Sequence, residues 1–209
     1  MERCVIVGGA GIGDYDYIRG KLKADDFVIF CDSGLKHLEK LQVQPGLIVG
    51  DFDSHANPHL PVETIVLPCE KDDTDTVFAV KEALKRGYEE FLLIGMTGAR
   101  MDHTLGNIYI LDNLDSQGKK GTIIDDYSEM EMISGQTAYI GGEYAYFSVL
   151  NITGLARGIC IRNAKYPLED GEIRSGYQYG ISNEVVPGRT AEVSVREGKL
   201  LLIKIRSEE

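Results

Sequence analysis

The chain of 209 residues lacks tryptophan and is poor in basic side chains. It has 22 Lys and Arg against 33 Asp and Glu, for a net charge of -11. A chain this acidic is a poor partner for DNA, RNA or an anionic membrane surface, so we expect neither nucleic acid nor membrane as a partner. One phosphorylated small molecule is still compatible with this charge, because Mg²⁺ and backbone N–H groups can neutralise it.

Clustered cysteines and long apolar runs are also lacking. Cys4, Cys31, Cys69 and Cys160 are widely spaced, which argues against a zinc site or a disulfide framework. Cys4 and Cys31 lie inside apolar runs, where we expect them to pack as small hydrophobic side chains. The run 4–7 is too short for a signal-peptide core, and no later stretch is long enough to span a membrane. We therefore expect a soluble cytoplasmic protein.

What the sequence does contain is an alternation of short apolar runs with helical periodicity, up to about residue 125. After about residue 127 the strands shorten, glycines interrupt them, and no amphipathic helix is evident. This change predicts an N-terminal open, mainly parallel α/β sheet domain followed by a C-terminal antiparallel β-sandwich domain. The expected strands of the first part are 3–7, 27–31, 47–49, 64–67, 90–94 and 121–125, with helices at 15–23, 35–41, 77–84 and 101–111.

The C-terminal part is expected to contain strands at 146–150, 158–162, 191–195 and 200–206. Glu197-Gly198 separates the last two strands, and glycine at this place is typical of a hairpin turn. On the helix 101–111, Met101, Leu105, Ile108 and Leu111 recur at helical spacing. This spacing places them on one face of the helix.

Two aspartates, Asp51 and Asp53, follow the apolar run 47–49, which is typical of the end of a buried strand. Open α/β sheets bind their ligands at the carboxyl ends of such strands. Because residues two apart in an extended segment point to the same side, the two carboxylates can converge on one cation. An Asp-x-Asp pair alone is also typical of a solvated acidic loop, but two further acidic clusters downstream favour a site.

A glycine-rich turn at 8–13 follows the first expected strand. Its spacing departs from the dinucleotide-binding fingerprint, which would need a third glycine at Asp14, after Gly9 and Gly11. We interpret this segment as a tight, phosphate-facing loop.

The second acidic cluster precedes the helix expected at 77–84. Asp73 or Thr74 is the expected N-cap, and acidic side chains in a first helical turn are favoured by the helix dipole. Capping accounts for one or two of the three carboxylates of Asp72, Asp73 and Asp75. The third, with Lys71 beside it, leaves charge to be explained.

The third cluster lies in the segment 95–103, where a strand, a glycine turn and a helix follow one another. Arg100 and Asp102 stand at the start of that helix, and this arrangement suits a polyphosphate. It is not a Walker loop, because Gly-Lys-Ser/Thr is missing. Taken singly, His103 and Asn107 are ordinary capping or helix-surface positions.

Five motifs occur in order along the chain: Asp32-x-Gly34, Gly50-Asp51-x-Asp53-Ser54, Lys71-Asp72-x-Thr74-Asp75, Gly95-x-x-Gly98-x-Arg100-x-Asp102-His103 and Ser182-Asn183. In this order and at this spacing they resemble thiamine pyrophosphokinase of the bacterial type, over nearly the whole chain. The resemblance implies a catalytic α/β domain at 1–130 that binds nucleotide and Mg²⁺. It also implies a thiamine-binding β-sandwich domain at 131–209, and a homodimer with its sites between subunits.

The resemblance further implies the reaction, in which thiamine and ATP give thiamine diphosphate and AMP. It marks Asp51, Asp53, Asp75, Arg100 and Asp102 as catalytic, with Asp51, Asp53 and Asp75 as ligands of Mg²⁺. The substrate-binding positions that it implies are Asp32, Ser54, Lys71, Asp72, Thr74, Gly98, His103, Asn107, Ser182 and Asn183.

This chemistry agrees with the residues. Pyrophosphoryl transfer needs charge neutralisation and in-line positioning more than covalent help. Mg²⁺ usually takes one or two carboxylates, so the aspartates of the motifs exceed its needs if they share one pocket. The surplus can attract the thiamine cation or accept the proton of its hydroxyl group, while Arg100 and Lys71 would hold phosphate oxygens. Which aspartate binds metal and which acts as a base stays open.

Two positions depart from the family pattern. Ser33 stands where the first motif usually has a glycine, and this changes how closely a nucleotide can approach. Some members of the family stack a tryptophan on thiamine. This chain has none, and Tyr177 or Tyr179, just before Ser182, is the expected substitute.

Two other functions are compatible with these residues. One is another Mg²⁺-dependent nucleotidyl or phosphoryl transferase, which the products distinguish, since release of ADP rather than AMP marks an ordinary kinase. The other is a non-catalytic sensor of thiamine or nucleotide, and any turnover of ATP would exclude it.

Overall fold

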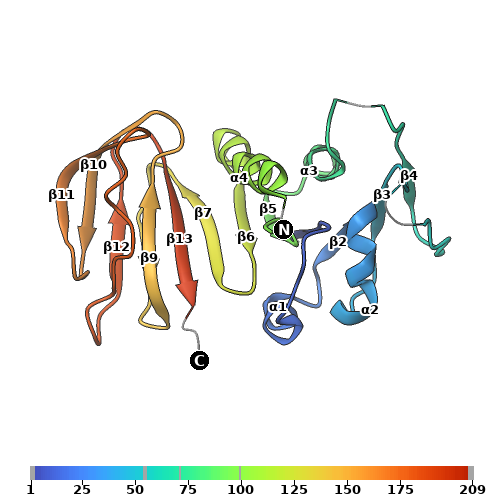
Figure 1. Cartoon of the computed structure of the whole chain (residues 1–209), viewed down its shortest axis with the longest axis horizontal. Coiled ribbons are helices and arrows are strands. Elements are labelled where there is room, and N and C mark those ends of the chain that lie inside the picture. Colours follow the sequence, from blue (N-terminus) through green and yellow to red (C-terminus); the bar gives the residue numbers. More distant parts are fainter. Residues whose placement is uncertain (1–2, 54–55, 71, 99, 207–209) are drawn as a thin grey trace. The chain divides into compact units, whose positions relative to one another are not determined.

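The computed structural model describes residues 3–53, 56–70, 72–98 and 100–206. The chain divides into two compact units, Met1–Asp126 and Tyr127–Glu209. The first is an α/β unit and the second consists of β-strands, so the predicted fold class is confirmed (Figure 1).

A parallel sheet is the centre of the first unit. Its strands follow the order β4-β3-β2-β1-β5-β6, and every neighbouring pair is parallel. β1 and β3 are buried along their whole length, because helices cover both faces of such a sheet. The strands are β1 (Cys4–Val7), β2 (Phe27–Cys31), β3 (Leu47–Gly50), β4 (Thr64–Val66), β5 (Glu90–Ile94) and β6 (Lys120–Ile124).

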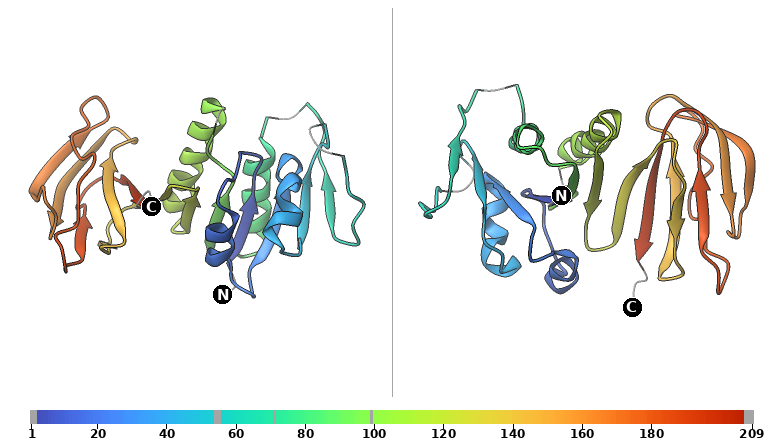
Figure 2. Two further views of the ribbon diagram at one scale, coloured as in Figure 1. Left: turned by 60° about the horizontal axis from the view of Figure 1, so that its bottom comes forward. Right: turned by 180° about the vertical axis from the view of Figure 1, so that it is seen from behind.

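The helices lie on both faces of this sheet, with α1 and α2 on one face and α3 and α4 on the other (Figures 1 and 2). Asp14, which breaks the dinucleotide fingerprint, caps α1 by accepting a bond from the Tyr17 N–H at 2.9 Å. Thr74 caps α3, as predicted, with its hydroxyl accepting from the Val77 N–H at 3.2 Å. The helices are α1 (Tyr15–Lys21), α2 (Leu38–Leu41), α3 (Asp75–Lys85) and α4 (Met101–Ser116), with a 3₁₀ helix η1 (Asp32–His37) before α2.

The strand order reverses between β1 and β5. From β1 the chain continues through β2 and β3 to β4 on one side, and then returns to place β5 against the other side of β1. Backbone bonds hold the two strand ends together, from Gly8 N to Ile94 O at 2.8 Å and from Ala10 N to Gly95 O at 2.9 Å. Such a reversal opens a crevice at the carboxyl ends of the strands, and ligands of open α/β sheets bind there.

Glycine is required on both sides of this reversal. A Cβ on Gly8 would lie 2.7 Å from the Gly95 carbonyl oxygen, and one on Gly95 would lie 2.5 Å from the Gly8 carbonyl oxygen. Gly95 also has a φ of 67°, which L-residues with side chains rarely adopt. The two strand ends therefore approach as closely as they do because neither carries a side chain.

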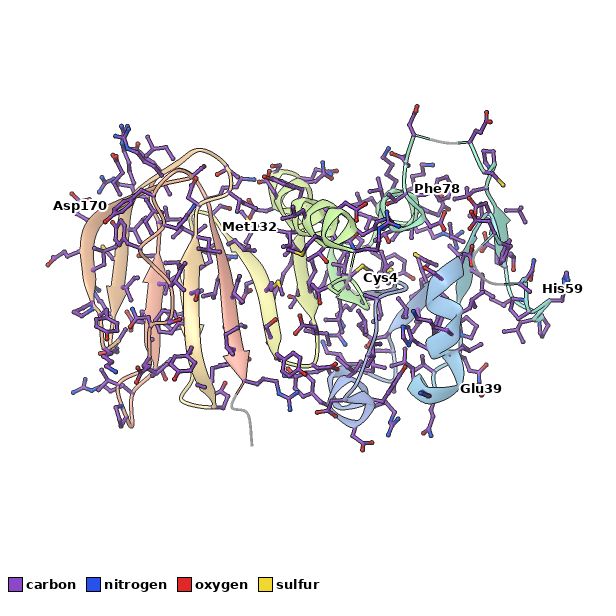
Figure 3. The ribbon with its side chains drawn as sticks, viewed as in Figure 1. Cys4, Glu39, His59, Phe78, Met132 and Asp170 are labelled. Atoms are coloured by element: carbon purple, nitrogen blue, oxygen red, sulfur yellow. The ribbon has the colours of Figure 1, made fainter. Side chains whose placement is uncertain are left out.

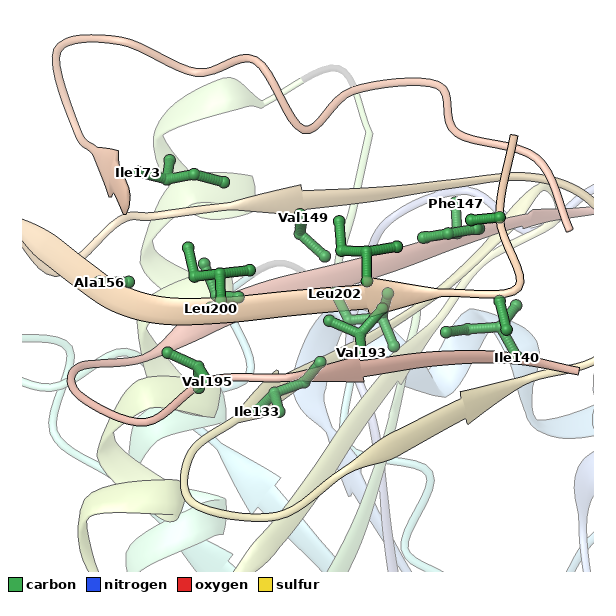
Figure 4. Close-up of a cluster of buried hydrophobic side chains, with 14 residues drawn as sticks. Ile133, Ile140, Phe147, Val149, Ala156, Ile173, Val193, Val195, Leu200 and Leu202 are labelled. Carbon is green, nitrogen blue, oxygen red and sulfur yellow. The ribbon is translucent and has the colours of Figure 1, made fainter. Parts of the chain in front are cut away.

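The second unit contains two groups of antiparallel strands, in the orders β7-β13-β9 and β11-β10-β12-β8. Side chains from both groups fill one core, which includes Phe147, Ile161, Val193 and Leu202 (Figure 4). This is the arrangement of a β-sandwich. The strands are β7 (Ser128–Ile133), β8 (Ala138–Ile140), β9 (Tyr144–Leu150), β10 (Leu155–Arg162), β11 (Leu168–Arg174), β12 (Ala191–Ser194) and β13 (Leu200–Arg206).

The hairpin expected around Glu197-Gly198 is wrong. β12 pairs with β10 and β8, whereas β13 pairs with β7 and β9, so the turn carries the chain from one sheet to the other. A glycine turn between two strands gives the same local pattern in either case. Only the pairing partners, which lie far away in the sequence, distinguish the two arrangements.

The apolar residues that recur at helical spacing on α4 do not form its buried face. Met101 and Leu105 are 62% and 52% exposed, whereas Thr104 and Asn107 are buried beside Ile110, Leu111 and Leu114. The first two turns of the helix thus turn polar side chains inward. Both side chains bind backbone groups of the preceding loop, which offsets the cost of burying them.

The leucines at 35, 38 and 41 do not form one helix, since η1 covers the first part and α2 is a single turn. Cys4, which is labelled in Figure 3, and Cys31 are both buried and free, as predicted. Burial raises the pKa of each thiol to about 12. Among the helices in the described part of the chain, none has the length and apolar character needed to cross a bilayer.

We predict that Gly34→Ala destabilises the first unit by about 1–3 kcal/mol, the usual effect of forcing an extra group into a packed site. A Cβ at Gly34 would overlap the backbone carbonyl of Val7, which cannot move aside. Gly106→Ala is the control, because nothing lies within 4 Å of its Cβ position in α4 and alanine favours helix. Thermal unfolding should show a lower Tm for the first variant and an unchanged or higher Tm for the second. An unchanged Tm for Gly34→Ala would contradict the close packing of β1 against η1.

Candidate active site

A pocket of about 420 Å³ lies at the carboxyl ends of the strands in the first unit. Three segments that follow strands contribute to it, after β1, β2 and β5, together with the beginnings of α3 and α4. It therefore occupies the crevice that the reversal between β1 and β5 creates. Its lining residues are Gly9, Ala10, Gly11, Ser33, Lys36, Thr76, Gly95, Met96, Gly98, Arg100, His103, Thr104 and Asn107.

The glycine-rich loop after β1 forms one wall of this pocket. Lys36 binds the carbonyl of Gly9 through its ammonium group, and the Nε2 atom of His37 lies 2.8 Å from the carbonyl of Ala10. Ser33 packs directly against Gly9, so closely that a Cβ on the glycine would overlap the serine hydroxyl. The serine that departs from the family pattern thus occupies space that Gly9 leaves open.

The opposite wall is the loop after β5 together with the start of α4. The Gly98 N–H donates to the Thr104 hydroxyl at 3.1 Å, and the amide nitrogen of Asn107 donates to the Met96 carbonyl at 2.9 Å. Gly98, His103 and Asn107 all line the pocket, as expected of a substrate-binding segment. Asn107 is only 9% exposed and holds the loop through this bond, so it is not a helix-surface residue.

Arg100 and Asp102 form a two-pronged ion pair at the mouth of the pocket. The Arg100 Nε and Nη2 atoms lie 3.0 and 2.6 Å from the two Asp102 carboxylate oxygens. The bonds from Arg100 hold the pKa of Asp102 well below its usual range, and those from Asp102 raise the pKa of Arg100. Both groups are exposed and charged at neutral pH, and Asp102 is a weak proton acceptor.

Three carboxylates converge beside the pocket. Asp32 follows β2, Asp51 follows β3 and Asp75 opens α3, and one oxygen from each lies within 4.8 Å of the other two. Asp32 is 1% exposed, and the other two are half-buried. Gly50 makes this approach possible, because a Cβ there would overlap the side chain of Asp32.

This group of carboxylates can hold a hard divalent cation. It offers only oxygen ligands, with no thiolate or imidazole among its members, and this donor set suits Mg²⁺ better than Zn²⁺. Three carboxylates this close repel one another, and a cation between them would offset that repulsion. Asp51 and Asp75 were predicted as metal ligands. Asp32 is predicted only as a substrate-binding residue, and it joins the other two because β2 lies beside β3 in the sheet.

Of the other residues predicted in this region, Asp53, Asp72 and Thr74 are described by the structure, and none of them belongs to the three-carboxylate group. Asp53 is exposed and outside the three-carboxylate group, with its N–H 3.4 Å from an oxygen of Asp51. Asp72 is exposed, and Thr74 is occupied as the cap of α3. Ser54 and Lys71 lie outside the described residues.

A smaller pocket, of about 150 Å³, lies in the second unit. Asn183 is 4% exposed at its base and clamps the backbone of Tyr166, donating to its carbonyl at 2.8 Å and accepting from its N–H at 3.0 Å. The exposed ring of Tyr166 is thereby held at the rim. The lining residues are Ile161, Tyr166, Pro167, Leu168, Tyr179, Gly180, Ile181 and Asn183.

Of the remaining residues predicted for this region, some line the small pocket and others do not. Ser182 is exposed, has a φ of 57° and is not among the residues that line the small pocket. Of the two tyrosines expected in place of tryptophan, Tyr179 lines the pocket and Tyr177 packs against it, with ring centroids 5.6 Å apart. The Tyr179 hydroxyl donates to the Glu172 carbonyl at 2.8 Å, which fixes that ring.

Four residues that line the two pockets are not predicted as such from the sequence: Ser33, Lys36, Thr104 and Tyr166. A signal existed for Lys36, which stands four residues after Asp32 and so one turn along the same segment. Tyr166 precedes a proline in an extended segment, a position with little local signal for a binding role. Its place at the pocket depends on Asn183, which is 17 residues away.

Comparison with known proteins identifies relatives across both units. The family model of the thiamin pyrophosphokinase catalytic domain matches residues 18–123, and that of the thiamin pyrophosphokinase vitamin B1 binding domain matches residues 136–200. A thiamine pyrophosphokinase of Bacillus subtilis is 29% identical over 194 residues, which are 84% of this chain and 86% of that protein.

Solved structures agree with this match. The crystal structure of thiamine pyrophosphokinase from Bacillus subtilis has a TM-score of 0.84 at 25% identity, covering 99% of this chain and 100% of that chain. That of thiamin pyrophosphokinase from Geobacillus thermodenitrificans has a TM-score of 0.82 at 26% identity, covering 99% of both chains.

We predict that Asn107→Leu lowers the free energy of unfolding by about 1–3 kcal/mol, because the Met96 carbonyl loses its buried donor. Asn113→Leu, at an exposed position of the same helix, is the matched control and should change stability by less than about 0.5 kcal/mol. Denaturant unfolding of the two variants measures both values. Equal stability of the two would mean that the Asn107 bond does not hold the loop.

Proposed function

Because the chain belongs to the thiamine pyrophosphokinase family, we propose that it transfers the pyrophosphoryl group of ATP to thiamine, giving thiamine diphosphate and AMP. The observation that carries this function is the match of both family models, one in each unit. The matched relatives are named for this one activity, so neither another phosphoryl transferase nor a non-catalytic sensor is favoured. With ATP as donor, the reaction is proposed to take place in the cytoplasm.

ATP is proposed to bind in the 420 Å³ pocket of the first unit. The glycine-rich loop allows phosphates to approach the backbone, and the start of α4 presents N–H groups to an anion. Arg100 and Lys36 line the pocket and supply positive charge there, although the chain as a whole has a net charge of -11. Gly98, His103 and Asn107 complete the nucleotide site, with Lys71 and Ser54 as further substrate contacts carried over from the resemblance.

Mg²⁺ is proposed to be held by Asp51, Asp53 and Asp75, the ligands that the resemblance implies. The three-carboxylate group supports Asp51 and Asp75 and adds Asp32, which lies within 4.8 Å of both. When bound, the ion supplies positive charge to the phosphate oxygens of ATP. The carboxylates fix where that charge is held, and the Thr74 cap keeps the start of α3, which carries Asp75, in place. Asp72 and Thr74 are retained as substrate contacts from the resemblance.

Asp102 is proposed to orient Arg100 rather than to accept a proton. Its pKa is lowered by the bonds from Arg100, so it takes up a proton poorly at neutral pH. A guanidinium held at two points presents its remaining N–H groups in a fixed direction, which suits a phosphate. The proton acceptor for the thiamine hydroxyl is then to be sought among the other aspartates.

Thiamine is proposed to bind in the second unit, within the domain that we assign to residues 131–209, with the catalytic domain at 1–130. The small pocket supports this assignment, because its rim carries the ring of Tyr166 and its wall the ring of Tyr179. Either ring can stack on the aromatic rings of thiamine in place of tryptophan. Asn183 acts through Tyr166, whose backbone it clamps, and Ser182 is retained as a substrate contact from the resemblance.

A homodimer with its sites between subunits is part of the proposal, carried over from the resemblance. Sedimentation of the purified enzyme at decreasing concentration tests it. Thiamine affinity should fall as the dimer dissociates, before nucleotide affinity does, and a fully active monomer would refute shared sites.

The activity is tested by incubating the enzyme with ATP, Mg²⁺ and thiamine, and by reading AMP and thiamine diphosphate. We predict equal amounts of both products and no activity in excess chelator, because carboxylates and nucleotide phosphates repel without a cation between them. Asp51→Asn, Asp53→Asn, Asp75→Asn and Asp102→Asn should each lower turnover by at least about a hundredfold, as typical for loss of one electrostatic element.

Asp73→Asn is the control for these variants, because Asp73 pairs with Lys81 away from the pocket at 2.6 Å. It should keep near-normal turnover, and all variants should keep the Tm of the parent within a few degrees. Near-normal turnover in all four test variants would reduce these aspartates to capping and surface roles. ADP as the product would refute pyrophosphoryl transfer.

We predict that Asn183→Ala raises the KM for thiamine by roughly tenfold and leaves the KM for ATP unchanged. The loss of its three bonds, including both to Tyr166, frees the ring at the rim of the small pocket. Asn151→Ala is the control, since Asn151 is as deeply buried in the same unit but binds the carbonyl of Lys199 outside that pocket. Equal effects of Asn183→Ala on both substrates would place the thiamine site elsewhere.

A further inference from the structure

His37 is a buried histidine for which the proposed reaction has no role. It ends η1, the 3₁₀ helix that begins at Asp32, and it is 2% exposed. Both of its ring nitrogens have partners: Nε2 lies 2.8 Å from the Ala10 carbonyl, and Nδ1 lies 2.7 Å from the Tyr15 hydroxyl. A histidine bound on both sides in this way has a fixed ring orientation.

These two partners determine where the proton lies. A carbonyl oxygen only accepts, so Nε2 must carry hydrogen and donate to Ala10. In the neutral ring Nδ1 is then an acceptor, and the Tyr15 hydroxyl donates to it. Burial lowers the pKa of His37, which favours this neutral form.

The bond to Ala10 is one of several that hold the glycine-rich loop. Ala10 also donates through its N–H to the Gly95 carbonyl at 2.9 Å, so its peptide groups are fixed from β5 on one side and from η1 on the other. At the far end, Asp126 accepts from the N–H groups of Gly13 and Asp14 at 2.8 and 2.9 Å. Between these points Ile12 packs against the hydrophobic core of the first unit, whereas Gly9 and Gly11 have no side chain to hold the wall that faces the pocket.

We infer that His37 and Tyr15 are positioning residues for the nucleotide. By holding the Ala10 carbonyl from behind, they fix the shape of the loop wall formed by Gly9, Ala10 and Gly11. His37 is not among the residues that line the pocket and acts through the loop. The inference rests on the proposed function, in that ATP is taken to occupy this pocket.

The same short helix ties the loop to the carboxylate group. Asp32 at its first position belongs to the three-carboxylate group, Lys36 holds the Gly9 carbonyl, and His37 at its last position holds Ala10. The loop that His37 holds is therefore kept at a fixed distance from the three-carboxylate group. Loss of the His37 bond should loosen ATP binding without moving the aspartates.

The test compares variants of His37 whose side chains place a nitrogen at the position of Nε2, at the position of Nδ1, or at neither. The side-chain nitrogen of glutamine reaches about as far as Nε2 of histidine, whereas that of asparagine reaches only as far as Nδ1. His37→Gln should therefore retain the bond to Ala10 and a near-normal KM for ATP. His37→Asn and His37→Leu should raise the KM for ATP by roughly tenfold, the effect of losing one buried hydrogen bond. Tyr15→Phe should give a smaller rise.

In all four variants the KM for thiamine and kcat should stay within about twofold of the parent. Binding of a non-hydrolysable ATP analogue, measured by calorimetry with Mg²⁺, should weaken in the same order as the KM for ATP rises. Asn151→Ala, which removes a comparable buried bond in the second unit, should lower the Tm without changing the KM for ATP.

An unchanged KM for ATP in His37→Asn, or equal effects of glutamine and asparagine, would overturn the inference and leave His37 a packing residue. If His37→Leu fails to fold, the glutamine and asparagine pair and Tyr15→Phe still decide. Failure of the parent enzyme itself to bind the ATP analogue would refute the proposed function instead, so the two failures are distinguishable.

Discussion

The close approach of β1 and β5 is the constraint on which the site of the first unit depends. Two glycines face one another there, and a Cβ on either would press against the carbonyl oxygen of the other. Because the sheet is parallel, every segment that leaves a strand in the same direction ends at this edge. The glycine-rich loop, η1, the Asp51 turn and the start of α4 are neighbours for that reason, although more than 90 residues separate the first from the last.

Charge at this edge is divided between two regions. Asp32, Asp51 and Asp75 gather negative charge at the ends of β2 and β3 and at the start of α3, whereas Lys36 and Arg100 stand at the pocket. An anionic substrate that bridged the two regions would need a cation on one side and would meet basic side chains on the other. A strongly acidic chain can bind a polyphosphate in this way without a broad basic surface.

The sequence predicts the sheet of the first unit well, because a strand buried on both faces is a continuous apolar run that no surface requirement interrupts. It also indicates that Asp51, at the end of a buried strand, can meet other carboxylates there. Asp75 is predicted as a metal ligand only by the resemblance, because the residues alone make it an acidic side chain in a first helical turn. The sequence fails where distant pairing decides. Asp32 joins the carboxylates only because β2 lies beside β3, β12 and β13 separate into different sheets, and Tyr166 reaches the small pocket only through Asn183. On α4, polar side chains that serve a loop reverse the face that hydrophobicity predicts.

Ser33 packs so closely against Gly9 that the two positions share one volume. A side chain fits at position 9 only when position 33 has none, and the hydroxyl of Ser33 therefore requires glycine at position 9. The two positions are therefore sterically coupled, although they are 24 residues apart and neither pairs with the other through a regular element. The wall of the 420 Å³ pocket is thus a joint property of the segments that follow β1 and β2, and neither segment can change its side chain there independently of the other.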